Sequence, residues 1–231
     1  TVLQGSLLPA LIFGGAIWLI LNSVPPDIQR VFSFRNYLDS LRGILSQRRM
    51  VLVLFFAGGF GGGQSVVFTF LPIYLREDLG VSSLTLGVYL FLAQAAGIAS
   101  QPIMGYLSDR LDRKVVLVPS LTILGLSIAS LYFVPAGWPF LIGVLIMGAF
   151  LFSLMSILLA SAMDLVTYDV QATAVSLVFG SAVIVSGVAP YIGGVLADSF
   201  GVEIAFLWAA ALLLATAAFA ALTRWRGELA Q

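Results

Sequence analysis

Seven runs of about twenty mainly apolar residues follow one another along the chain, and short polar segments separate them. A helix rises 1.5 Å per residue, so it needs about 20 apolar residues to cross the hydrocarbon of a bilayer. The predicted fold class is therefore all-α, a polytopic membrane helix bundle. The predicted helices are Val2–Val24, Met50–Leu75, Leu84–Leu107, Val115–Val134, Phe140–Met163, Ala172–Leu196 and Ile204–Thr223.

The composition agrees with a membrane protein and excludes several other classes. Apolar residues make up 60% of the chain and charged residues 10%, whereas a soluble domain carries about 25% charge. The formal net charge is zero, so no basic field would attract nucleic acid. Because Cys and His are both absent, thiolate or imidazole metal ligands and the usual catalytic triads cannot form. We therefore expect no metal site, no cofactor, no nucleic-acid partner and no enzymatic activity.

A polar linker follows the first apolar run. Pro25 and Pro26 end that run, because proline cannot continue a helix without losing a hydrogen bond. Within residues 25–49, apolar side chains recur at helical spacing, with Arg and Asp elsewhere on the wheel; they are Phe34, Tyr37, Leu38, Leu41, Ile44 and Leu45. This pattern predicts an amphipathic helix. It either lies on the bilayer with its arginines near anionic headgroups or is a solvated helical linker.

The positively charged residues are distributed unequally between the two sides of the predicted bundle. Five lie in the linker, three in residues 105–114 and two in the C-terminal tail, which leaves Arg76 alone on the other side. Short connections rich in Lys and Arg stay in the cytoplasm. The sequence therefore predicts that residues 105–114 and the C-terminus are cytoplasmic, in the cell (plasma or inner) membrane.

Residues 105–114 carry five of the 22 charged residues of the chain, and we expect them to form a short loop between two helices. They read Gly-Tyr-Leu-Ser-Asp-Arg-Leu-Asp-Arg-Lys, and Leu117 follows. This segment resembles the cytoplasmic loop motif of the major facilitator superfamily of secondary transporters. The matching residues are Gly105, Leu107, Asp109, Arg110, Arg113, Lys114 and Leu117. Asp112 departs from the pattern, since the family usually has Gly there.

The resemblance implies a domain organisation. Transporters of this superfamily have twelve helices in two six-helix halves, joined by a cytoplasmic linker. Residues 1–24 would be the transmembrane helix that ends the first half, residues 25–49 the cytoplasmic amphipathic linker, and residues 50–231 the C-terminal six-helix half. The missing N-terminal half and the lipid bilayer would be partners. The alternative, a first half behind an extra helix, would expect an Arg in Phe140–Met163, which has none.

An internal repeat favours this assignment. Residues 105–111 and 194–200 both read Gly-x-Leu-small-Asp-x-apolar, and each ends the second helix of a predicted triplet, on opposite faces of the membrane. Similar segments in opposite orientation are what a 3+3 inverted repeat produces, and this superfamily is an established example of one.

The family resemblance also implies a function, the transport of a small solute by alternating access. A proton or another coupling ion would be a further partner, and the direction of transport stays open. For Gly105, Asp109, Arg110 and Arg113 it implies a gate. Asp109 would face the N-terminus of the helix that begins near Ala172 and pair with Arg110 or Arg113, while Gly105 would let helices approach closely. The alternative is a solvated, charged turn.

Candidate residues of the solute cavity lie in the second, third and fifth predicted helices: Gln64, Phe68, Gln94, Phe150 and Ser153. The glycine-rich stretch 58–63 precedes Gln64, and glycine-interrupted spans indicate transporter binding sites. Gly148 echoes this stretch in the repeat partner. Close packing of helices explains the glycines equally well. For Gln101 we expect a hydrogen bond to a neighbouring helix. Such a lining suits an amphiphilic or apolar organic solute, such as a drug, better than a polyanion.

Gly187, Pro190, Gly193 and Gly194 form a stretch suited to helix bending or close packing, and we interpret it as a hinge or packing face. The alternative function is a non-transporting membrane receptor or scaffold subunit that keeps the same fold. An intramembrane enzyme would need a catalytic cluster within the bilayer, whereas the acidic residues lie at predicted helix ends.

Overall fold

The computed structural model describes residues 11–19, 34–135 and 137–223, with side chains in 11–19, 38–135 and 137–223. The chain divides into two compact units, residues 1–39 and 40–231. In the first unit, residues 11–19 are helical. The rest of the predicted first helix lies outside the described residues, as do Pro25 and Pro26. The predicted domain boundaries therefore stay predictions.

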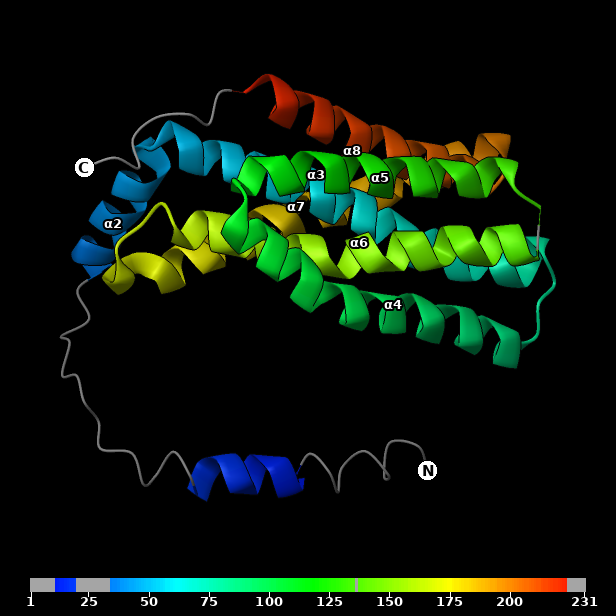
Figure 1. Ribbon diagram of the computed structural model, residues 1–231, viewed down its shortest axis with the longest axis horizontal. Helices are drawn as coiled ribbons and strands as arrows, with labels where there is room; N and C mark the ends of the chain where they lie inside the picture. The colour runs from blue at the N-terminus through cyan, green and yellow to red at the C-terminus, as the bar shows by residue number, and fades with distance from the viewer. Residues whose placement is uncertain (1–10, 20–33, 136, 224–231) are drawn as a thin grey trace. The chain divides into compact units, whose positions relative to one another are not determined.

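In the described part of the second unit, six long helices form a bundle (Figure 1). They are α3 (Arg48–Ile73), α4 (Ser83–Arg110), α5 (Arg113–Phe133), α6 (Trp138–Met163), α7 (Gln171–Phe200) and α8 (Ile204–Leu222). By length and composition each can cross a membrane. No strand occurs in the described ranges. The predicted all-α membrane helix bundle is thus confirmed.

The predicted amphipathic helix is α2 (Phe34–Ser46), and the division between the two units falls within it. Ile44 is buried in the core of the second unit, whereas Leu45 is exposed. The last turns of α2 therefore pack one apolar side chain against the bundle. Its contact with a membrane surface stays a prediction.

The connection between α4 and α5 is shorter than predicted. Asp109 and Arg110 belong to the last turn of α4, Arg113 begins α5, and only Leu111 and Asp112 lie between the helices. The predicted loop over residues 105–114 is therefore wrong in extent. The physical reason is a helix cap, because the Asp112 carboxylate accepts a hydrogen bond of 2.9 Å from the backbone N–H of Lys114. This cap also gives a structural role to the residue that departs from the family pattern.

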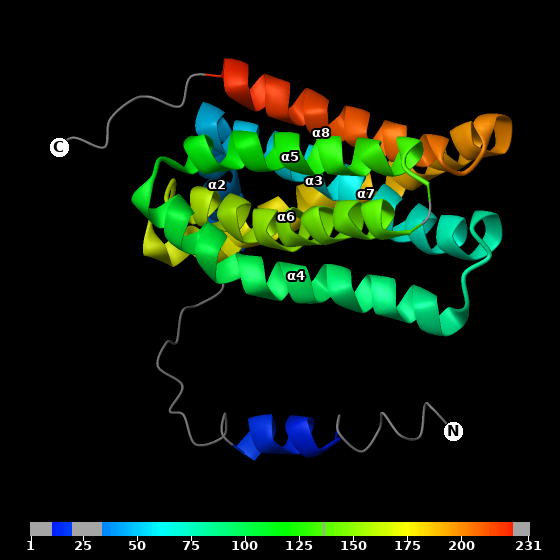
Figure 2. The ribbon, with the colours of Figure 1, turned by 45° about the vertical axis from the view of Figure 1, so that its right-hand side comes forward.

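The main helix contacts follow a symmetric pattern. The most extensive packing is between α3 and α7, α4 and α6, and α5 and α8. Figure 2 shows α4 alongside α6 and α5 alongside α8. The pattern is unchanged when the first triplet, α3 to α5, is exchanged with the second, α6 to α8. An inverted repeat requires this property.

Two close helix crossings obey the same symmetry. A Cβ atom built on Gly61 of α3 would lie 2.8 Å from the Cβ of Ala182 in α7, and one built on Gly148 of α6 would lie 2.6 Å from the Cα of Ala93 in α4. Gly105 and Gly194 begin the two repeated segments. Ala93 precedes Gly105 by the same number of residues as Ala182 precedes Gly194, so the two alanines are equivalent positions of the repeat. The repeat therefore places a glycine against an alanine at both crossings.

The remaining glycines of the 58–63 stretch are also in packed positions. Added Cβ atoms on Gly58 and Gly62 would meet Val185 of α7, and those on Gly59 and Gly63 would meet α8. Because every glycine of this stretch is closely approached by α7 or α8, the structure favours close packing as the explanation for them.

Candidate functional site

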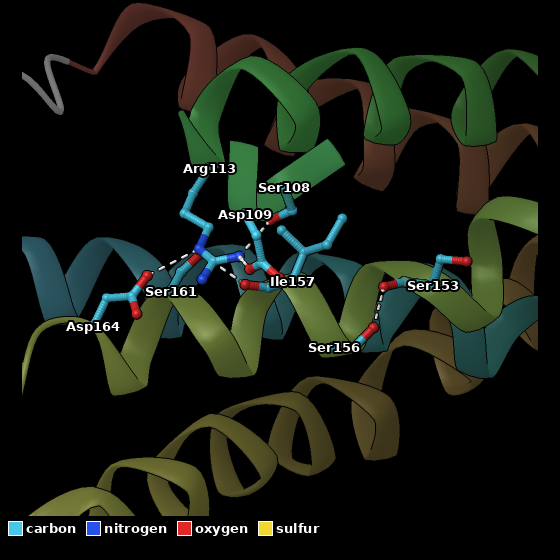
Figure 3. A network of polar contacts seen from close by, with 8 residues as sticks. All are labelled: Ser108, Asp109, Arg113, Ser153, Ser156, Ile157, Ser161 and Asp164. Carbon is cyan, nitrogen blue, oxygen red and sulfur yellow. Dashed lines mark hydrogen bonds and ion pairs between the residues drawn. The ribbon is translucent and has the colours of Figure 1, made fainter. Parts of the chain in front are cut away.

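Arg113 is the centre of a polar network at one end of the bundle (Figure 3). Its Nη1 donates to Asp109 Oδ1 at 2.6 Å and to Ser108 Oγ at 2.8 Å, and its Nε donates to Asp164 Oδ2 at 2.9 Å. Arg113 begins α5, Asp109 is in the last turn of α4, and Asp164 directly follows α6. One guanidinium group thus connects the ends of three helices.

The two carboxylates of the network are accessible to solvent, whereas Arg113 is half-buried. The Arg113 side chain is 21% exposed, whereas those of Asp109 and Asp164 are 69% and 54% exposed. Exposed ion pairs typically contribute about 0–1 kcal/mol each. The network can therefore position three helix ends, and breaking it requires little free energy.

Asp164 is the functional candidate that the sequence analysis missed, because an acidic residue at a helix end is ordinarily a solvated cap. The sequence did contain one signal for a role of Asp164, which is that its connection is predicted at the same end of the bundle as Arg113. The described contacts of Asp109 select Arg113 as its ion-pair partner rather than Arg110, whose guanidinium lies 4.7 Å from the centre of the Tyr106 ring.

Of two expectations about the gating motif, the described residues do not meet one and do not test the other. A Cβ atom built on Gly105 would meet no atom within 4 Å among the described residues, so Gly105 mediates no close helix approach there. The expected position of Asp109 before the N-terminus of α7 stays a prediction, as does the gating role itself.

Lys114 forms a second connection at this end. Its Nζ donates to the backbone carbonyls of Ala221 at 2.8 Å and Thr223 at 2.6 Å, at the C-terminal end of α8. A cation there satisfies carbonyl groups that have no partner in the helix and interacts favourably with the helix dipole. Arg113 and Lys114, neighbours in sequence, thus attach the start of α5 to different helices.

A small apolar pocket lies between α3, α4 and α6. Its volume is about 160 Å³. Phe68, Gln94 and Phe152 line it, together with Val67, Leu71, Pro72, Leu90, Ala93, Met147 and Leu151. The Phe68 and Phe152 ring centroids are 5.9 Å apart, and Gln94 is the one polar side chain of the lining. The pocket therefore presents an aromatic and aliphatic surface with a single amide.

The structure brings together two of the five predicted cavity residues, Phe68 and Gln94, and adds Phe152. Gln64 and Phe150 are half-buried and lie outside this lining. Ser153 is fully buried, and its hydroxyl is 2.7 Å from that of Ser100 across the α4–α6 interface. In this structure Ser153 therefore belongs to helix packing, because its hydrogen-bonding partners lie within that interface.

Two further polar contacts join helices. The Gln101 amide donates to the Phe152 carbonyl at 2.9 Å, as expected for a residue that connects helices. Trp208 Nε1 of α8 donates at 3.0 Å to the carbonyl of Ala189 in α7.

All four predicted hinge residues lie within the continuous helix α7. An added Cβ on Gly193 would be 3.0 Å from the Phe70 ring, and one on Gly194 would be 3.9 Å from it, whereas one on Gly187 would meet no described atom within 4 Å. Gly193 therefore allows close packing, and hinge motion at Pro190 stays a prediction.

Two helices leave most of their surface uncovered. In the most apolar part of α4 only 11% of the residues are buried, and in α7 22%, against 44–56% in the other four long helices. Many of the exposed side chains on these two helices are large and apolar; they include Phe91, Ile98, Ile184 and Tyr191. Such surfaces require lipid or another protein segment as a neighbour.

In the part of the chain that the structure describes, six long helices, each apolar enough to cross a membrane, pack as two interlocked triplets with a polar network at one end. This arrangement defines a polytopic membrane helix bundle. Residues 50–230 match the family model of the Major Facilitator Superfamily. The chain therefore belongs to this superfamily of transporters, which confirms the resemblance carried by residues 105–114.

Two curated relatives have names that describe drug resistance. The chain is 34% identical over 163 residues to the Multi-drug resistance efflux pump PmrA homolog of Lactococcus lactis subsp. lactis (strain IL1403), a match that covers 66% of the chain and 38% of the relative. It is 32% identical over 165 residues to the Multidrug resistance protein MdtG of Proteus mirabilis (strain HI4320), covering 66% of the chain and 39% of the relative. The chain thus matches about two-fifths of the length of each relative.

Proposed function

We propose that this chain is the C-terminal part of a secondary transporter that moves an amphiphilic organic solute, drug-like in chemistry, across a cell membrane by alternating access. The observation that carries the proposal is the pocket between α3, α4 and α6, whose lining is aromatic and aliphatic with one uncharged amide. The names of the two relatives support the same solute class.

The pocket is a subsite and not a complete binding site. Its volume of about 160 Å³ is below the roughly 300–1,000 Å³ of sites for drug-sized ligands. It would hold one ring or short alkyl group of the solute between Phe68 and Phe152, with Gln94 forming a hydrogen bond at its edge. The rest of the site would come from the N-terminal half, which would cover the exposed apolar face of α4.

The Arg113 network would serve as a latch in the transport cycle. It joins the ends of α4, α5 and α6 at the end of the bundle that carries Arg48, Arg49, Arg110, Arg113 and Lys114, which we call the basic end. We place the basic end in the cytoplasm, because the positively charged connections gather there. Its ion pairs are exposed, so a conformational change can break and restore them at a cost of about 1 kcal/mol each.

The test is a flux measurement on the protein expressed from its complete gene and reconstituted in vesicles. A fluorescent lipophilic cation such as ethidium would be the probe, with and without an imposed pH gradient. We expect saturable flux that Gln94→Ala and Phe152→Leu lower at least fivefold. Phe133→Leu is a matched control, since Phe133 is 73% exposed at the end of α5, away from the pocket.

Flux that is equal in all these variants would show that the pocket is not part of the solute path. An absence of flux for cations, neutral drugs and organic acids alike would favour the alternative, a receptor or scaffold subunit with this fold. Dependence of flux on the pH gradient would identify the proton as the coupling ion.

A further inference from the structure

A second and larger crevice lies on another side of the bundle, where α7 and α8 both pack against α3. Its volume is about 530 Å³. Val51, Phe55, Gly58 and Gly59 of α3 contribute to its lining, with Ile184 of α7 and Ala215 of α8. None of these residues belongs to the pocket proposed for the solute, so the crevice requires a separate explanation.

The chemistry of the lining indicates an apolar occupant. The polar side chains of the lining are Ser181 and Thr216. Each donates its hydroxyl proton within its own helix, Ser181 to the carbonyl of Val178 at 2.8 Å and Thr216 to the carbonyl of Leu212 at 2.7 Å. Since neither hydroxyl has a proton left to donate, the crevice recognises shape and not polar groups.

The length of the crevice matches one leaflet of a bilayer. On α3 it extends from Val51 to Gly59, a rise of about 12 Å at 1.5 Å per residue. Half of the hydrocarbon core is about 15 Å thick. The crevice begins one turn above the start of α3 at Arg48 and ends near the middle of the membrane. A lipid acyl chain from the leaflet at the basic end has this length and direction.

A positive charge lies at the mouth of the crevice. Arg48 is exposed and precedes Val51 by three residues and Phe55 by seven, so all three lie on one face of α3. A phosphate group bound at Arg48 would therefore continue into a chain that lies over Val51 and Phe55. Arg48 would thus contact the headgroup of a phospholipid, and the apolar surface that follows it would contact the acyl chain.

We propose that this crevice binds an anionic phospholipid of the leaflet at the basic end, with the phosphate at Arg48 and one acyl chain over Gly58 and Gly59. This function goes beyond solute transport. Bulk lipid is as apolar as the crevice, so selectivity comes from fit and charge. One basic residue near the surface predicts about fivefold preference for an anionic over a zwitterionic headgroup.

The experiment is photocrosslinking of the complete protein in nanodiscs. The probes are phosphatidylglycerol and phosphatidylcholine, each with a diazirine near the end of one acyl chain. Trypsin cleaves after Arg49 and Arg76, so label at the inner end of the crevice, near Gly58 and Gly59 of α3, appears in the peptide 50–76. We expect about five times more label on this peptide from phosphatidylglycerol than from phosphatidylcholine.

Two pairs of variants make the test specific. Ala215→Phe fills the crevice from α8 and should lower the label at least fivefold, whereas Ala218→Phe, at another exposed position of α8 outside the lining, should not. Arg48→Gln should equalise the two headgroups, whereas Arg42→Gln should keep the preference. Ala215→Leu is the milder filling variant if Ala215→Phe does not elute as a single monodisperse species.

Equal label from both lipids in the native protein would overturn the proposal, as would label that Ala215→Phe and Ala215→Leu both leave unchanged. Label from a photoactivatable lipophilic cation, with none from either lipid, would also overturn it and assign the crevice to solute.

Discussion

The helix crossing at Gly148 can be tested by adding a single methyl group. A Cβ at this position would lie 2.6 Å from the Cα of Ala93 and even closer to its carbonyl oxygen. Both atoms belong to the backbone of α4, so neither can move without moving the helix. Overpacking a closely packed interior costs about 1–3 kcal/mol, and replacing glycine by alanine within a helix recovers about 0.5–1 kcal/mol. Gly148→Ala should therefore destabilise the protein by up to about 2.5 kcal/mol.

The matched control is Gly180→Ala in α7, where an added Cβ meets no described atom within 4 Å. This variant gains the helix propensity without the collision, so it should be as stable as the native protein or more stable. The assay is thermal unfolding of the purified complete protein in detergent, measured by tryptophan fluorescence. A lower midpoint for Gly148→Ala and an equal or higher one for Gly180→Ala is expected. Equal midpoints for the two variants would refute the close crossing.

Three further predictions concern the basic end and the pocket. Arg113→Gln should change the free energy of unfolding by less than about 2 kcal/mol, because its two ion pairs are exposed, yet it should lower vesicle flux strongly; a large loss of stability would contradict the latch. Asp112→Ala should destabilise the start of α5 by about 1 kcal/mol, whereas Asp112→Gly should cost only a few tenths, as expected for a helix cap; thermal midpoints in the reverse order would exclude the cap. Gln94→Glu should select cationic solutes over neutral ones in the flux assay, because it adds a negative charge to the pocket; unchanged solute selectivity would place Gln94 outside the solute path.

The helices could be predicted from the sequence because each needs only a long apolar run. All six predicted spans that the structure describes begin within two residues of their helices and overlap them closely. The exact ends were harder, since they depend on local hydrogen bonds. Asp112 restarts a helix two residues after α4 ends, and hydropathy contains no information about such a cap.

The candidate site could be predicted only in part. Phe68 and Gln94 share a pocket, but the third key residue, Phe152, looks like any other apolar residue of a span. Similarly, Ser153 could line a cavity or join two helices, and only its partner Ser100, about fifty residues earlier in the chain, decides between these roles. Residues far apart in sequence determine the function of a polar group in a membrane helix, and their pairing is not encoded locally.

The repeat extends the argument from Gly148 to its counterpart, Gly61. Because Gly61 meets Ala182 as Gly148 meets Ala93, Gly61→Ala should lower the thermal midpoint in the same direction as Gly148→Ala. The two crossings join different helix pairs and share no side chain, so their costs should add in the double variant. A double variant no less stable than either single one would show that the crossings are not independent, and it would contradict two separate packing contacts related by the repeat.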